Sequence, residues 1–192
     1  MVATAQPLAG DSWCAENRAV ALAVTRQLGI ADEVALAGMA SAPADPGDTR
    51  LASARCGNQT LPCLDARSAN DPESFLRTLA AFHCKPDAAS ADAKPLLLIY
   101  NHRADRPYRL LDFAAAFRAL NPAQVLITGE RPAWSTWRAL RRIPNIPPFR
   151  FEMARQLPAA LAELAGQCGR LVFCGNTHGL DLSAILNTHT HG

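Results

Sequence analysis

LLLIYNHRADRPYR, residues 96–109, joins an apolar run to a turn that carries three arginines and an aspartate. A continuous apolar run such as Leu96 to Tyr100 is typical of a strand covered on both faces of a sheet. In open α/β sheets, ligands bind at the carboxyl ends of such strands. The polar residues after Tyr100 are therefore candidates for a binding site.

Similar apolar runs recur along the chain and alternate with helical periods. Strands are predicted at 61–66, 96–101, 124–128 and 170–174. Helices are predicted between them, near 72–83, 107–120, 132–142 and 154–166. This alternation predicts an α/β fold with a doubly wound sheet that begins near Arg50. The proline-rich segment 143–151 is expected to be a loop that leads into a short edge strand.

Residues 1–49 are expected to form a helical segment followed by a linker. Asp11 or Ser12 can cap a helix that ends at Gly29 and whose apolar positions recur every four residues. These positions are Val20, Val24 and Leu28. A second helix is expected at about 31–40, and the prolines and glycine of 41–50 indicate a linker. The main domain is accordingly assigned to residues 50–192.

Composition and charge narrow the possible partners. The chain has 192 residues, 49% of them hydrophobic, and a formal net charge of +2. So small a net charge gives no electrostatic reason to expect nucleic acid or an anionic membrane as the main partner. The six cysteines form no CxxC pair, so buried thiols in a reducing compartment are expected. Because neither a signal peptide nor an 18-residue apolar run is visible, we expect a cytoplasmic location.

The polar clusters share one structural place, the turn that follows a predicted strand. The four turns are SANDPES (68–74), NHRADRPYR (101–109), TGERP (128–132) and GNTHG (175–179). In a parallel sheet all four would line one edge. Together with helix N-termini, whose free N–H groups favour anions, this edge is expected to hold a phosphate or a carboxylate.

Each cluster also has a structural interpretation. Asp71 with Pro72 is ordinary chemistry for the start of a helix, and Asp105 with Arg106 is compatible with a surface ion pair. The turns 128–130 and 175–179 are compatible with tight turns alone. The tail NTHTHG is compatible with a metal clip through His189 and His191 or with a frayed end.

The order and spacing of several segments resemble one known family. The segments are ENRAVALAVTRQLGI (16–30), PADPGDTR (43–50), ANDPES (69–74), NHRADRPYR (101–109), LITGE (126–130) and GNTHG (175–179). Together they resemble the ligase subunit of poly-γ-glutamate synthase, a member of the Mur ligase superfamily. The resemblance runs from about Trp13 to Leu186 and covers the C-terminal half of such enzymes.

The resemblance implies a Rossmann-like, doubly wound, mostly parallel sheet of the Mur ligase C-terminal type, preceded by the last helices of a central domain. It also implies an ATP-dependent amide ligase that works through an acyl phosphate. Here glutamate would be joined to the end of a poly-γ-glutamate chain. Such chemistry depends on positioning and on charge neutralisation, usually by Mg²⁺ and basic side chains.

The resemblance assigns binding positions but no catalytic residue and no metal ligand. The positions near the nucleotide are Asn17, Asn70, Asp71, Arg103, Asp105 and Arg106. Among them, Asn17 would lie near adenine, and Asp105 and Arg106 would face ribose or phosphates, which suits a guanidinium fork. Asn176 and His178 would hold the incoming amino acid or the closed domain interface.

Two departures from the family pattern limit the expected activity. No GxxxxGK[ST] motif occurs in the sequence, so we expect a P-loop half, in cis or in trans, to hold the phosphates and most of the Mg²⁺. The segment Asp65–Arg67 also replaces an expected Asn-Gly-aromatic stretch. Further expected partners are glutamate, the polymer end and the membrane subunits of a polymer synthase, which would bring the chain to the inner membrane.

Other functions stay open at this point. A non-catalytic module that binds a nucleotide or an amino acid is the alternative to an incomplete ligase. A dehydrogenase-like dinucleotide site is disfavoured because no GxGxxG follows any predicted strand.

Overall fold

The computed structural model describes residues 15–42, 49–84 and 94–187. Contacts divide the chain into two units, with the boundary between Pro46 and Gly47. Within the described ranges, no helix is both long enough and apolar enough to cross a bilayer.

The first unit contains helices α1 (Ala15–Gln27) and α2 (Asp32–Ser41). The two helices are joined through Arg26, whose Nε and Nη2 donate to the Asp32 carboxylate at 2.8 and 2.6 Å. The predicted cap at Asp11 or Ser12 lies outside the described residues. The apolar positions predicted in the first helix are Val20, Val24 and Leu28, and all three are exposed. Among the described residues, these three positions thus form an exposed apolar stripe.

A seven-stranded sheet forms the centre of the second unit, in the order β5-β4-β3-β6-β2-β1-β7. The strands are β1 (Arg50–Cys56), β2 (Gln59–Asp65), β3 (Leu96–His102), β4 (Gln124–Gly129), β5 (Phe149–Phe151), β6 (Arg170–Cys174) and β7 (Leu186–Asn187). Five neighbouring strands, β5, β4, β3, β6 and β2, are parallel to one another. By contrast, β1 is antiparallel to β2, and β7 is antiparallel to β1. The predicted doubly wound, mostly parallel α/β sheet is therefore confirmed.

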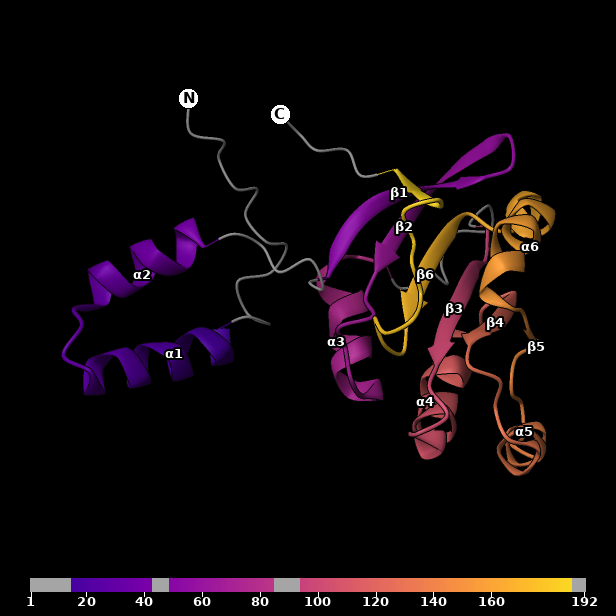
Figure 1. The fold of residues 1–192 in the computed structure, drawn as a ribbon, viewed down its shortest axis with the longest axis horizontal. Helices are drawn as coiled ribbons and strands as arrows, with labels where there is room; N and C mark the ends of the chain where they lie inside the picture. Colours follow the sequence, from indigo (N-terminus) through magenta and orange to yellow (C-terminus); the bar gives the residue numbers. More distant parts are fainter. Residues whose placement is uncertain (1–14, 43–48, 85–93, 188–192) are drawn as a thin grey trace. The chain divides into compact units, whose positions relative to one another are not determined.

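Helices cover both faces of the sheet (Figure 1). The helices of this unit are α3 (Pro72–Ala81), α4 (Pro107–Leu120), α5 (Trp134–Arg141) and α6 (Leu157–Leu164). Apolar side chains of α3, α4 and α5 pack on one face, and those of α6 and the segment 180–186 pack on the other. The helix predicted at 154–166 consists of α6 with a 3₁₀ turn at each end, Ala154–Gln156 and Ala165–Gln167.

The apolar run of β3 is buried on both faces, as its sequence predicts. Leu98 and Tyr100 contact the α3–α5 side, while Leu97 and Ile99 contact the α6 side. The Tyr100 ring lies 5.2 Å from the Phe113 ring, centroid to centroid, in an edge-on arrangement. Because β3 has no solvent-facing side, its sequence does not alternate between apolar and polar residues.

The cysteines that the structure describes are free and buried, as predicted from their apolar surroundings. They are Cys56, Cys63, Cys84, Cys168 and Cys174. Burial raises the pKa of each of these thiols, that of Cys56 to about 11. At neutral pH they are therefore protonated core side chains rather than nucleophiles.

Candidate functional site

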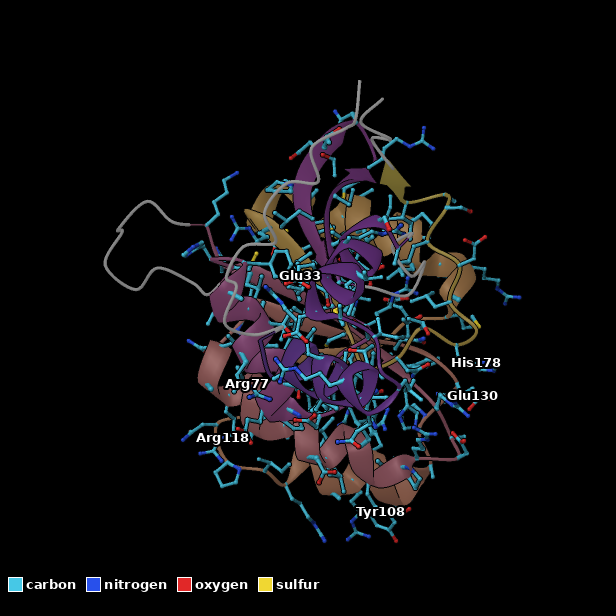
Figure 2. The ribbon with its side chains drawn as sticks, turned by 90° about the vertical axis from the view of Figure 1, so that its left-hand side faces the viewer. Glu33, Arg77, Tyr108, Arg118, Glu130 and His178 are labelled. Atoms are coloured by element: carbon cyan, nitrogen blue, oxygen red, sulfur yellow. The ribbon has the colours of Figure 1, made fainter. Side chains whose placement is uncertain are left out.

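The four polar turns lie at one edge of the sheet, where the parallel strands end. The pairing register sets Asp65 opposite Phe173, Tyr100 opposite Cys174 and Asn101 opposite Thr128. The strand ends are therefore nearly level, which confirms the prediction that their turns share an edge. Figure 2 shows Glu130 and His178, from the turns after β4 and β6, on the same side of the molecule.

The neighbouring strands β3 and β6 form the topological switch point of this sheet. After β3 the chain continues into α4 on one face, and after β6 it continues into segment 180–186 on the other face. In α/β sheets, ligands bind at the carboxyl ends of the strands where the chain diverges in this way.

Asn101 and Asn176 connect the two strands at this switch point. Asn101 Nδ2 donates to the carbonyl oxygens of Asn176 and His178, both at 2.8 Å, and Asn176 Nδ2 donates to the Asn101 carbonyl at 2.6 Å. The His178 N–H in turn donates to Asn176 Oδ1 at 2.9 Å. Both asparagines are buried, while the His178 side chain is exposed. Asn176 thus shapes the turn, and of the two predicted substrate positions His178 is the one that faces solvent.

Two glycines allow this close approach of backbone. An added Cβ on Gly175 would lie 2.5 Å from the Asn101 carbonyl oxygen, and one on Gly129 would lie 2.3 Å from Asn101 Oδ1. Both glycines also have positive φ angles, +101° and +82°. A side chain at either position would push the turns apart.

Several buried polar atoms at this edge have no hydrogen-bond partner among the residues described. They are Asn101 Oδ1, both ring nitrogens of His102, and Thr128 Oγ1. Burial lowers the pKa of His102, although Glu130 and Asp105 act in the opposite direction. The imidazole is therefore neutral near pH 7, with one donor and one acceptor nitrogen. The edge retains unused hydrogen-bonding capacity next to the switch point.

The turn NHRADR is held by its own charged groups. Arg103 donates to the Asp105 carboxylate through Nε at 2.9 Å and Nη2 at 2.6 Å, and this pair lowers the pKa of Asp105. The Ala104 N–H donates to the Glu130 carboxylate, which joins this turn to the one after β4. The interpretation that Asp105 pairs with Arg106 is thus wrong, because Arg103 forms the bidentate pair.

Arg106 occupies the N-cap position of α4 and is exposed. In the described part of the chain, its side chain makes no hydrogen bond or ion pair. Among the predicted nucleotide-binding residues after β3, it is the guanidinium left available for an anion.

Asn70 and Asp71 follow β2. Asp71 caps α3 by accepting a hydrogen bond from the Ser74 N–H at 2.9 Å, which lowers the pKa of its carboxyl. The structural interpretation of Asp71 is therefore confirmed. Asn70 Oδ1 accepts from Arg109 Nη1 at 3.4 Å, so it connects the turn after β2 with the start of α4.

The remaining predicted positions are Asn17, His189 and His191. Asn17 belongs to α1 in the first unit, and its side chain lies outside the described residues. His189 and His191 lie outside the described residues as well.

The segment that departs from the family pattern forms a buried ion pair. Arg67 Nε donates to Asp65 Oδ1 at 2.8 Å, and Arg67 Nη1 donates to the Leu180 carbonyl at 2.8 Å. Arg67 therefore fastens the end of β2 to the chain that follows the GNTHG turn.

The chemistry of this edge fits an anion better than a metal ion. No group of three or more His, Cys, Asp or Glu side chains able to hold a metal occurs in the described parts of the chain. By contrast, the Arg106 guanidinium stands at the N-terminus of a 14-residue helix, where a phosphate is favoured. Within the described residues, this arrangement suits an anion such as a phosphate.

Comparison with known proteins identifies the family. A family model described as the poly-gamma-glutamate synthase CapB C-terminal domain matches residues 53–189. The chain belongs to this family, as the resemblance in its turns suggested. The capsule biosynthesis protein CapB of Bacillus anthracis is 34% identical to it over 121 residues. That alignment covers 62% of this chain and 25% of the relative, so the matched region is about a quarter of the relative's length.

Proposed function

We propose that this chain is the C-terminal part of an ATP-dependent amide ligase that adds glutamate to poly-γ-glutamate. The observation that carries the proposal is the placement of four polar turns along the sheet edge that contains the β3–β6 switch point, in a member of the CapB C-terminal family. Ligands of α/β sheets bind at such a point. The CapB relative is named for capsule biosynthesis, which is consistent with a polymer-forming reaction.

In this proposal the residues of the chain bind and orient rather than react. Arg106 would neutralise phosphate charge, and its exposed position leaves it free to approach a nucleotide held by another domain. His178 would contact the incoming amino acid, because its backbone is fixed by Asn101 and Asn176 while its side chain faces solvent. Phosphorylation of a carboxylate by ATP would supply the activated acyl group, and an incoming amine would displace phosphate.

The proposal requires partners. A P-loop half, in cis or in trans, would hold the nucleotide phosphates and Mg²⁺, because no such motif occurs in this sequence. Membrane subunits of a polymer synthase would bring the assembly to the inner membrane from the cytoplasmic side.

Reconstitution tests this function. Incubated alone with ATP, Mg²⁺ and glutamate, the purified chain is expected to form no ADP. Adding the P-loop half of a CapB-type protein should produce glutamate-dependent ADP and longer polymer. ATPase activity of the chain alone would contradict the proposed division of labour. Failure of the mixture, despite formation of the complex, would favour a non-catalytic binding module.

A further inference from the structure

A pocket with a cavity volume of about 580 Å³ lies beside α5 and β5. None of its lining residues belongs to β3 or β6. Its lining combines aromatic rings with two guanidinium groups. The lining residues are Arg131, Pro132, Trp134, Trp137, Arg141 and Phe151. No residue of this set is among the predicted site residues, although Arg131 and Pro132 belong to the turn after β4.

The two arginines of the pocket lie over its rings at cation–π distance. The Arg131 Cζ atom lies 5.8 Å from the centroid of Phe151, and the Arg141 Cζ atom lies 5.8 Å from the centroid of Trp137. Trp137 is itself held by an edge-on contact with Phe149 at 4.9 Å. A guanidinium that stacks through its face keeps the N–H donors along its edge available for a planar anion.

No carboxylate of the described residues neutralises these arginines. Neither Arg131 nor Arg141 has an ion pair or a side-chain hydrogen bond there, and the pocket lining contains no acidic residue. The nearest acids along the chain have other partners, since Glu130 accepts from the Ala104 N–H and Glu152 pairs with Arg150 at 2.9 Å. Among the described residues, the pocket therefore presents two guanidinium groups that form no ion pair with a carboxylate.

The apolar surface of the pocket complements these charges. Trp134 is 72% exposed, which is unusual for so large an apolar side chain, and Pro132 lies beside it in the lining. A ligand that fits this surface has methylene groups to cover the rings and carboxylates to meet the guanidiniums. A nucleobase fits less well, because a base stacks on a free ring face, and arginines already lie over Phe151 and Trp137.

We propose that this pocket binds the polymer, holding two carboxylates of a γ-linked glutamyl chain on Arg131 and Arg141 while its methylene groups cover Trp134. The inference rests on the proposed function, because that function supplies the carboxylate-rich chain. It adds a contact for the polymer that extends from the turn after β4, at the edge where the amide bond would form, to α5 and β5.

Direct binding tests the proposal on the full chain. A γ-linked glutamate oligomer should change the intrinsic fluorescence in a saturable way, because two of the three tryptophans line the pocket. Arg131→Gln and Arg141→Gln should each weaken binding by about tenfold or more, as expected for the loss of charge-assisted hydrogen bonds. Arg55→Gln is the matched control, because Arg55 is exposed on β1, which four strands separate from β5 in the sheet order.

Three outcomes would overturn the pocket assignment. They are wild-type affinity in both pocket variants, an equal loss in Arg55→Gln, and displacement of the oligomer by ATP. Circular dichroism of each variant checks that it is folded, and a Trp134→Ala variant repeats the test without altering charge. If reconstituted ligase is active but its KM for polymer is unchanged in the pocket variants, the pocket assignment alone fails. If the oligomer binds as expected but the mixture makes no amide, the proposed ligase function alone fails.

Discussion

Asn101 and Asn176 exchange hydrogen bonds across the ends of β3 and β6, each side chain donating to the main-chain carbonyl of the other residue, at 2.8 and 2.6 Å. The two residues are separated by 75 positions in the sequence. Their pairing holds the GNTHG turn against β3 at the switch point beside which we place the ligand.

Removing one partner of this pair should destabilise the fold. Asn176→Ala leaves buried donors and acceptors unpaired, so the free energy of unfolding should fall by about 1–3 kcal/mol. Urea unfolding followed by circular dichroism measures the change. The exposed neighbour provides the control, since Thr177→Ala should alter stability by no more than about 0.5 kcal/mol. Equal effects in the two variants would refute a structural role for the Asn176 amide.

Two glycines with similar φ angles should respond differently to alanine. Gly179 has φ +71° and no neighbour within 4 Å of an added Cβ, so Gly179→Ala should cost only backbone strain, about 1–2 kcal/mol. Gly129 has φ +82° and contacts within 2.6 Å, so Gly129→Ala should cost about 1–3 kcal/mol more. Chemical denaturation of both variants gives the difference, and similar losses would mean that β3 and β4 yield easily at this edge.

Stability should depend on pH through His102. Burial lowers the pKa of His102 in the folded state, whereas the unfolded chain has the ordinary value of about 6.5. The unfolded state therefore binds more protons as the pH falls below about 7, and stability should decrease by up to about 1.4 kcal/mol per pH unit until the folded-state pKa is passed.

Comparing urea unfolding at about pH 7.5 and about pH 5.5 tests this sign. His102→Phe should flatten the dependence, because it removes the titrating group from the core. His178→Gln is the matched control for replacing a histidine, because the His178 side chain is exposed. A His102→Phe profile as steep as that of wild type would assign the effect to other groups.

Arg106 should matter for the reaction but not for folding. Its side chain makes no hydrogen bond or ion pair in the described structure, so Arg106→Ala should change the free energy of unfolding by less than about 0.5 kcal/mol. In the reconstituted enzyme, kcat/KM for ATP should fall by about tenfold or more, as expected for the loss of one charge-assisted contact. Arg118→Ala, an exposed arginine on the same helix, is the control and should retain activity.

The sequence predicts the parallel part of the sheet well, because β2, β3, β4 and β6 are apolar runs. It does not reveal β1 or β7. The residues that β1 buries, Ala54 and Cys56, are too small to give a strong alternating signal, and β7 has only two residues.

The edge that carries the candidate site follows from the parallel topology, but the roles of its side chains do not. The side chains of Asp71 and Asn176 form hydrogen bonds that stabilise their own turns, and Asp105 pairs with Arg103 rather than Arg106. The sequence does not show which of several polar neighbours forms each hydrogen bond. The sequence does contain a signal for Asn101 and Thr128, since each is a polar residue at the second-last position of an apolar strand.

The position of β6 has a consequence for the order of assembly. β6 is the last long strand along the chain, yet it pairs with β2 on one side and β3 on the other. The hairpin of β1 and β2 and the block of β3, β4 and β5 therefore have no strand-to-strand link until residues 170–174 are available. The contacts of β6 with β2 and β3 join segments that are distant in sequence, so forming them costs loop-closure entropy. Folding of this unit is therefore expected to be completed only after β6 has been synthesised.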